Sequence, residues 1–210
     1  GSRVVTGSDD RTARVWDVAT GESRLEFLGH SKLIESVSFS PDGSRVATAS
    51  QDGTARVWDA RTGAEIAEFK AHTDQVVALS FSPRGSRIVT ASHDRTARVW
   101  DAATGENLIE LMGHEDQVLA AAFSPDGSRV VTTSSDRTAR VWDAATGAIL
   151  AKLEGHTFAV YSASFSPDGS RIITASGDST ARIWDVATGT SLAELDGHGG
   201  LIYSAEISSD

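Results

Sequence analysis

Cysteine is absent from the 210-residue sequence, which excludes disulfide bonds and thiolate chemistry. The absence fits a cytoplasmic protein, and we expect the chain to be cytoplasmic. Runs of about 18 apolar residues are absent too, so the sequence predicts no membrane span and no membrane partner. The opening stretch GSRVVTGSDD has neither a signal-peptide pattern nor an initiating methionine. We therefore expect a fragment or a processed chain.

Positive charge is scarce. The sequence holds 19 lysines and arginines against 29 aspartates and glutamates, for a net charge of −10. A nucleic-acid-binding protein usually carries a basic patch that replaces counterions on the phosphates. Here the arginines are spread through the chain by a repeat, so we expect no nucleic-acid partner.

Motifs that carry catalysis or metal binding are missing as well. The sequence has no Gly-x-Ser-x-Gly, no His-Glu-x-x-His, no phosphate-binding loop and no calcium loop. His114 and Glu115 begin like the zinc motif, but Val118 stands where its second histidine would be. We expect no enzyme activity, no metal site and no cofactor.

What the sequence does contain is repetition. The stretch DRTARVWDAATG covers residues 94–105 and recurs at residues 136–147, and residues 10–21 differ from it only at Val18. The five tryptophans recur every 42 residues, and all of the six histidines except His93 keep the same step. The chain length equals five such periods. A fixed period of this size indicates a repeat architecture.

Each repeat alternates short β-rich runs with turns. In residues 30–71 the runs LIESVSF, SRVATAS, TARVWDA and AEIAEF are separated by SPDG, QDG and RTG. All four prolines of the chain fall in the same turn of their repeats, so none interrupts a strand. The alanine-rich stretches could be helical, but the β-branched runs and frequent glycines argue against this. The repeat predicts an antiparallel meander of four strands.

A single four-stranded sheet cannot cover both of its faces, so neighbouring repeats must do so. Radial stacking of such sheets around an axis gives a β-propeller. We predict an all-β fold, a β-propeller of five four-stranded antiparallel blades, in a single domain covering residues 1–210.

The motifs of each repeat resemble those of the WD40 repeat family over the whole chain. Trp-Asp occurs at residues 16–17, 58–59, 100–101, 142–143 and 184–185. Gly-His occurs at residues 29–30, 113–114, 155–156 and 197–198, whereas Ala71 precedes His72. The resemblance implies a propeller that acts as a rigid platform for other proteins.

The resemblance also implies a hydrogen-bonded tetrad in each repeat. Tryptophan can only donate, threonine can accept and donate, neutral histidine can do both, and aspartate accepts last, so the four side chains form a self-consistent relay. Cutting the relay would leave a buried polar group without a partner. The complete sets are His30, Thr48, Asp52 and Trp58; His72, Thr90, Asp94 and Trp100; His114, Thr132, Asp136 and Trp142; and His156, Thr174, Asp178 and Trp184.

Two incomplete sets remain: Thr6, Asp10 and Trp16 lack a histidine, and His198 lacks the other three residues. We predict that a last strand, at about residues 201–208, pairs with the first three strands and completes a mixed blade. Closure within one chain gives five blades, and closure between chains gives a larger ring and a homo-oligomer. The five copies could also be a piece of a longer array. Without closure both sheet edges would be exposed.

We expect functional residues at positions that differ between the copies, because a residue that recurs in every blade has a structural role in the blade. In the family, three positions of each repeat line one end of the central channel. The first is occupied by Leu33, Gln75, Gln117, Ala159 and Leu201; the second by Glu35, Val77, Leu119, Tyr161 and Tyr203; the third by Asp9, Gln51, His93, Ser135 and Gly177. Leu119, Tyr161, Leu201 and Tyr203, with Phe158 beside them, predict an apolar and aromatic half of this rim, of the kind that anchors a protein or peptide partner.

Other interpretations stay open. These side chains could simply pack within the blades. The chain could be an enzyme or metal binder that uses the channel mouth. Near-identical copies also fit recent duplication or deliberate design, in which case the propeller has no native partner. The leading hypothesis is a non-enzymatic protein-interaction scaffold.

Overall fold

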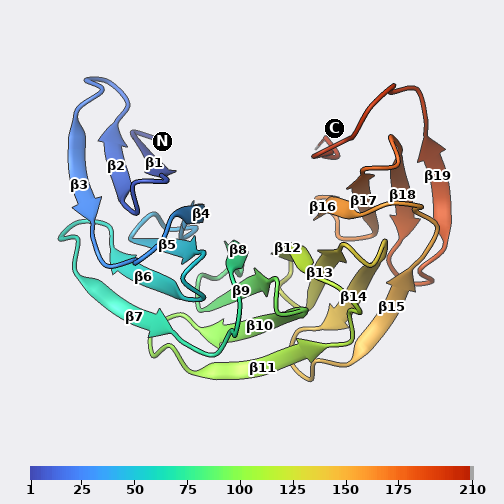
Figure 1. Ribbon diagram of the computed structural model, residues 1–210, viewed down its shortest axis with the longest axis horizontal. Helices are drawn as coiled ribbons and strands as arrows, with labels where there is room; N and C mark the ends of the chain where they lie inside the picture. The colour runs from blue at the N-terminus through green and yellow to red at the C-terminus, as the bar shows by residue number, and fades with distance from the viewer. Residues whose placement is uncertain (209–210) are drawn as a thin grey trace.

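A computed structural model describes residues 1–208 as strands and turns, with no helix among them. The strands form five antiparallel sheets, one with three strands and four with four. The sheets stand side by side along an arc, and the chain passes through them in sequence order (Figure 1). We call them blades 1 to 5. The prediction of an all-β propeller with meander blades is confirmed.

Each blade is a run of consecutive strands. Blade 1 holds β1 (Arg3–Gly7), β2 (Ala13–Asp17) and β3 (Ser23–Phe27). Blade 2 holds β4 (Ile34–Phe39), β5 (Arg45–Ser50), β6 (Ala55–Asp59) and β7 (Glu65–Phe69). Blade 3 holds β8 (Val76–Phe81), β9 (Arg87–Ser92), β10 (Thr96–Asp101) and β11 (Asn107–Met112). Blade 4 holds β12 (Val118–Phe123), β13 (Arg129–Ser134), β14 (Ala139–Asp143) and β15 (Ile149–Leu153), and blade 5 holds β16 (Val160–Phe165), β17 (Arg171–Ser176), β18 (Ala181–Asp185) and β19 (Ser191–Leu195).

The Ser-Pro-Asp-Gly turns fix the hairpin between the first two strands of a complete blade. In blade 2, the Ser40 hydroxyl donates to Asp42 Oδ1 at 2.6 Å, and the Gly43 N–H donates to the Ser40 carbonyl at 2.8 Å. Gly43 has a φ of 69°, a left-handed conformation that glycine adopts at little cost. The turn residues therefore set the register that the sequence pattern predicts.

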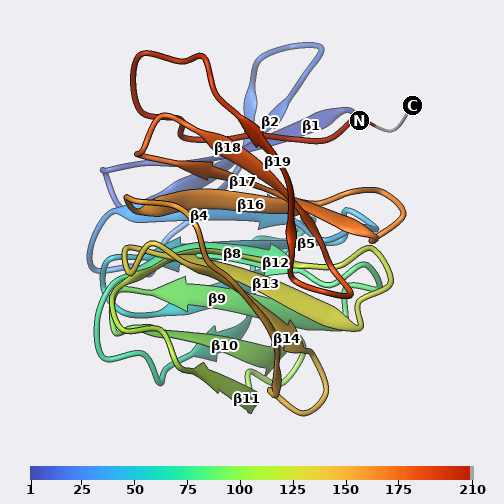
Figure 2. The same cartoon turned by 90° about the vertical axis from the view of Figure 1, so that its right-hand side faces the viewer.

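The hydrophobic core lies between blades. One core cluster joins Val57 and Phe69 of blade 2 with Ile88 and Trp100 of blade 3, all of them buried. The Phe69 and Trp100 rings stack with centroids 5.2 Å apart. Figure 2 shows the sheets layered on one another. Neighbouring blades therefore supply the cover that a single sheet cannot provide.

An arginine also joins neighbouring blades, at the end that carries the Ser-Pro-Asp-Gly turns. Arg45 in β5 donates from Nη2 to the Gly85 carbonyl at 2.6 Å, and its guanidinium lies 5.7 Å from the Phe81 ring centroid. Arg3 and Arg87 make the equivalent bonds to the blades that follow theirs. This contact was not predicted from the sequence, although an arginine recurs at this position in every repeat.

The structure does not show the ring closure that the sequence predicts. Blade 1 has three strands, and residues 201–208 contain no strand. The five sheets cover only part of a circle, so β1 and residues 201–208 lie on opposite sides of a gap (Figure 1). Residues 201–208 instead lie against blade 5, where the Ile202 N–H donates to the Ser176 carbonyl at 3.0 Å. The Ile34 N–H makes the same bond to the Ser8 carbonyl of blade 1, so this segment occupies the place of the first strand of a following blade.

Within residues 1–208, no helix is long and apolar enough to cross a membrane.

Candidate interaction surface

The relay of blade 2 runs from its third strand to its loops. Trp58 in β6 donates from Nε1 to the Thr48 hydroxyl at 3.0 Å. The Thr48 oxygen lies 2.8 Å from His30 Nε2, and His30 Nδ1 lies 3.0 Å from Asp52 Oδ2. Because the Trp58 N–H can only donate, the direction that satisfies every group has Thr48 donating to Nε2 and the Nδ1–H donating to Asp52. The relay fastens the loop before β4 to the turn between β5 and β6.

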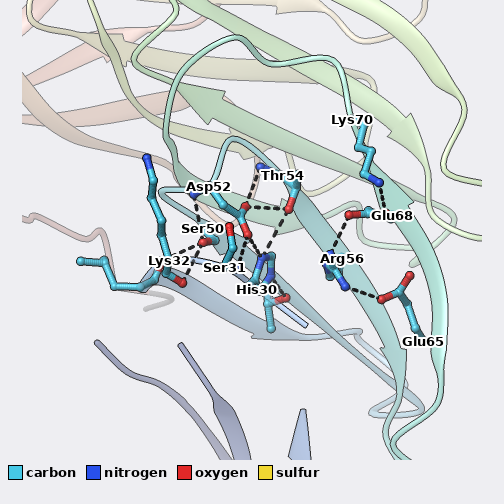
Figure 3. Close-up of polar contacts among 12 residues, drawn as sticks. His30, Ser31, Lys32, Ser50, Asp52, Thr54, Arg56, Glu65, Glu68 and Lys70 are labelled. Atoms are coloured by element: carbon cyan, nitrogen blue, oxygen red, sulfur yellow. Dashed lines mark hydrogen bonds and ion pairs between the residues drawn. The ribbon is translucent and has the colours of Figure 1, made fainter. Parts of the chain in front are cut away.

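Further polar groups surround the aspartate, as Figure 3 shows. The Thr54 hydroxyl donates to Asp52 Oδ1 at 2.7 Å, and the Ser31 N–H donates to Oδ2 at 2.9 Å. The Ser50 hydroxyl donates to the Leu33 carbonyl at 2.8 Å. The role of Thr54 was not predicted from the sequence, although a threonine stands two residues after the aspartate in every repeat.

The structure brings together the same four side chains in blades 3, 4 and 5. The Nε2···Thr and Nδ1···Asp distances are 2.8 Å for each of His72, His114 and His156. The tryptophan bonds are 2.8 Å for Trp100 and Trp142 and 2.9 Å for Trp184. Each relay therefore uses both ring nitrogens of its histidine.

The two incomplete sets are not brought together. In blade 1, Trp16 donates to Thr6 at 2.8 Å, but Asp10 accepts from Thr12 of its own turn. His198 is exposed on the other side of the gap.

Burial and hydrogen bonding fix the charges in the relay. Burial lowers the pKa of His30 and outweighs the nearby Asp52 carboxylate. Burial raises the pKa of Asp52, but bonds from Thr54, the Ser31 N–H and His30 overcome it and lower that pKa to about 2. At neutral pH the relay therefore pairs a neutral imidazole with a carboxylate. Because the His30 ring nitrogens already have partners, a structural role fits this arrangement better than proton transfer.

Two of the three rim positions meet directly in each complete blade. The backbone N–H of the third position donates to the carbonyl of the first: Gln51 to Leu33 at 3.1 Å, His93 to Gln75 at 3.0 Å, Ser135 to Gln117 at 2.9 Å, and Gly177 to Ala159 at 2.9 Å. These backbone bonds hold the variable side chains at one end of the blades, next to the relay loops. Blade 1, which holds Asp9, and residues 201–208 lie on opposite sides of the gap (Figure 1), and Asp9 and Leu201 make no such bond to each other.

The aromatic half of the rim forms a contiguous cluster. The Tyr161 and Tyr203 rings are 5.3 Å apart between centroids and tilted by 31°. Phe158 lies over Gly177, where an added Cβ would stand 2.3 Å from the Phe158 ring and 3.2 Å from Tyr161. Phe158 is 52% exposed and Tyr203 is 68% exposed. Glycine at the third position therefore makes room for an exposed aromatic surface, which we call the aromatic cluster: Phe158, Tyr161 and Tyr203.

The other half of the rim is polar. Gln51 donates from Nε2 to Glu35 Oε1 at 2.6 Å, which orients the two side chains across one blade. Gln75, Gln117, His93 and Val77 are half-buried, and Asp9 is exposed. Of the two leucines predicted for the apolar half, Leu119 is half-buried and Leu201 is exposed. The rim thus presents amide and carboxylate groups on blades 2 and 3 and aromatic rings on blade 5.

The part of the chain that the structure describes contains no candidate metal site. The residues at positions 1–208 include no group of three histidine, cysteine, aspartate or glutamate side chains placed to hold an ion. Each relay offers one histidine and one carboxylate, already bonded to each other.

Comparison with known proteins places these features in a family. A family model described as "WD domain, G-beta repeat" matches residues 1–17, 21–59, 63–101, 105–143 and 147–185. Ribosome assembly protein 4 of Chaetomium thermophilum is 48% identical over 42 residues, 20% of this chain and 8% of that protein. WD repeat-containing protein pop1 of Schizosaccharomyces pombe is 51% identical over 37 residues, 18% of this chain and 5% of that protein. Coronin-7 of Mus musculus is 45% identical over 40 residues, which are 19% of this chain and 4% of that protein. Each match therefore spans about one repeat and less than a tenth of the relative.

Proposed function

Because this chain belongs to the WD40 repeat family, we propose that it is a non-enzymatic scaffold that binds a protein or peptide at the rim. The rim combines repeated loops, held by the relays, with side chains that differ from blade to blade. Aromatic side chains contribute large contact areas and are enriched among residues that dominate binding energy. A cytoplasmic location stays a prediction.

The observation that carries the proposal is the exposure of the aromatic cluster. Phe158 and Tyr203 leave more than half of their surface open to solvent, at 52% and 68%. Tyr203 lies in residues 201–208, which no following blade covers, but Phe158 precedes β16 and is still open to solvent, whereas blade packing buries Trp142 and Trp184. Contiguous exposed apolar surface typically marks an interaction site.

Selection from a displayed peptide library tests the proposal. Peptides enriched on the wild-type protein would be titrated against Tyr161→Ala/Tyr203→Ala. We expect a loss of affinity of about tenfold or more, since interface anchors contribute about 2 kcal/mol or more. The matched control is Leu108→Ala/Leu150→Ala, which removes exposed apolar side chains from outer strands.

Equal affinity of the wild type and the tyrosine variant would contradict the proposal. Loss of the native circular dichroism spectrum together with binding would instead assign the tyrosines to blade packing, and would contradict it as well.

We also infer that a second copy of the chain covers the two ends of the arc. Val18 in blade 1 is 57% exposed, whereas the matching Ala60 and Val186 are 4% exposed between blades. At the other end Leu195 is 43% exposed, whereas the matching Phe69 and Leu153 are buried. Each end therefore exposes residues that meet one another at the internal blade junctions.

Pairing of copies would also complete the open relay. Residues 201–208 already occupy the first-strand position of a blade that would follow blade 5. The relay of blade 1 has Thr6, Asp10 and Trp16 but no histidine, and His198 of another copy would supply it. The sheet edge at β1 would be paired rather than open.

Sedimentation equilibrium measures this assembly. We expect a mass that is a multiple of 22.1 kDa and a return to the monomer in Val18→Asp. Met112→Asp, at a position 65% exposed on β11, should keep the wild-type mass. A wild-type monomer at all concentrations would overturn the inference.

A further inference from the structure

A cavity of about 510 Å³ lies at the junction of blades 1 and 2, at the end of the blades opposite the rim. Its wall includes Arg3 of β1, Arg24 of β3 and Arg61 from the turn that follows β6. Ser23 and Glu22 also line it. The volume is in the range of small-ligand sites, which is about 300–1,000 Å³.

Two of these arginines break the repeat. The residues that match Arg24 are Ile66, Leu108, Leu150 and Leu192. The residues that match Arg61 are Ala19, Ala103, Ala145 and Ala187. The two departures lie in different repeats, yet the fold brings them to one cavity together with the recurring Arg3. A residue that serves blade construction would recur in every copy, so these two serve something local to this junction.

Donors remain free in the cavity. Arg24 uses Nε and Nη2 on Asp17 Oδ2, at 3.1 and 2.6 Å, which leaves Nη1. Arg3 uses both terminal nitrogens on the carbonyls of Ala60 and Gly43. The Arg61 guanidinium makes no hydrogen bond or ion pair with residues 1–208, so all of its donors are available.

Three arginines gather at this cavity in a chain whose net charge is −10. Three guanidinium groups and one carboxylate, that of Glu22, line the cavity. Asp17 pairs with Arg24, and backbone hydrogen bonds together with the charge of Arg61 lower the pKa of the nearby Asp59 carboxyl. Guanidinium groups bind phosphoryl and carboxylate oxygens through paired hydrogen bonds. Leu25 and Val15 add an apolar wall. The cavity is larger than a bare phosphate ion needs and has room for the stem of a side chain.

We propose that this cavity binds an oxyanion, phosphoryl or carboxylate, carried on a side chain of a partner polypeptide, with Arg61 as the main contact. The site is separate from the rim and goes beyond the proposed function. Phosphoserine and aspartate or glutamate offer the same oxygen chemistry, and the experiment separates them.

Calorimetric titration with three short peptides tests the proposal: one with phosphoserine, one with aspartate at that position, and one with serine. We expect binding of the phosphoserine peptide, of the aspartate peptide, or of both, but not of the serine peptide. The affinity should fall with added salt, because the contact is an exposed ion pair.

The decisive variant is Arg24→Leu/Arg61→Ala, which installs the residues found in the other repeats. We expect an unchanged melting temperature and a loss of affinity of about tenfold or more. Arg84→Asp is the matched control: it removes the same two units of charge, and its aspartate is the residue of the matching turns at Asp42, Asp126 and Asp168. It should bind as the wild type does.

The proposal is overturned if neither anionic peptide binds, or if the double variant binds as the wild type does. Binding lost equally in Arg84→Asp would assign the effect to overall charge and would also overturn it. The tyrosine variant of the rim should keep full binding here, so failure at one site is distinguishable from failure at the other. A nuclear magnetic resonance shift of the Arg61 Nε–H on titration would locate the ligand.

Discussion

The Arg87 guanidinium lies 5.3 Å from the ring centroid of Phe123, which belongs to the next blade. The same group donates to the Ala144 carbonyl at 2.6 Å and to the Gly127 carbonyl at 2.7 Å. One side chain thus links two blades through a cation–π contact and two charged hydrogen bonds, a combination that lysine cannot reproduce.

Replacing Arg87 with lysine should lower the stability of the blade junction. Loss of one such hydrogen bond costs about 1.5–3 kcal/mol, which corresponds to a fall in melting temperature of about 3–12 °C for a chain of this size. Arg129→Lys is the control, because Arg129 makes no hydrogen bond from its guanidinium to residues 1–208. An equal fall in melting temperature for Arg87→Lys and Arg129→Lys would show that the interblade hydrogen bonds do not stabilise the fold.

Replacing Thr132 with valine should cut the relay of blade 4 while keeping its shape. The Trp142 N–H and His114 Nε2 would both lose their buried partner. We expect a loss in the free energy of unfolding of about 1–3 kcal/mol for each stranded group.

Thr6→Val removes the same hydroxyl where the relay lacks its histidine and Thr6 is exposed. Water can replace the lost bond there, so the loss should be smaller. Chemical denaturation gives the free energy of unfolding of the two variants. A decrease for Thr6→Val as large as that for Thr132→Val would refute a contribution of the relay to stability.

Acidification should destabilise the fold in two steps. Burial lowers the pKa of His30 and of His156, so the unfolded chain takes up protons before the folded one. Their contribution to stability is complete above about pH 6.5 and is lost as the pH falls below that value.

The second step comes from the relay aspartates, since the fold lowers the pKa of Asp94, Asp136 and Asp178 as well as that of Asp52. The pKa of the Asp52 carboxyl is lowered to about 2, so its contribution is present above about pH 3.8 and is lost as the pH falls toward 2. Melting temperatures between pH 8 and 2 measure both steps. A melting temperature that rises between pH 7 and 5 would contradict the direction.

The sequence was sufficient to predict the blades because two independent patterns agree. The tryptophans, such as Trp58, recur at a fixed interval and define the repeat, and turns such as Ser40 to Gly43 mark where strands end. Rim positions could be placed for the same reason, since repeat register carries a position from one blade to the next.

The features that could not be predicted from the sequence depend on the packing of neighbouring blades against each other. Curvature is set by packing across blade junctions, so the gap between β1 and residues 201–208 has no sequence signal. The cavity at Arg24 and Arg61 was missed because these residues are 37 positions apart and meet only across a junction. Arg3-type residues recur in every repeat, but their acceptors are backbone carbonyls, which no motif reveals.

Nuclear magnetic resonance of the histidine ring nitrogens at neutral pH is the most direct test of the central claim, which is that a directional relay holds each of blades 2 to 5. His30, His72, His114 and His156 should each show a protected Nδ1–H and an unprotonated Nε2, because Nδ1 faces an aspartate and Nε2 faces a threonine hydroxyl. The exposed His198 should exchange its ring proton rapidly. Four rings with the proton on Nε2, or with both ring nitrogens exchanging freely, would contradict the relay.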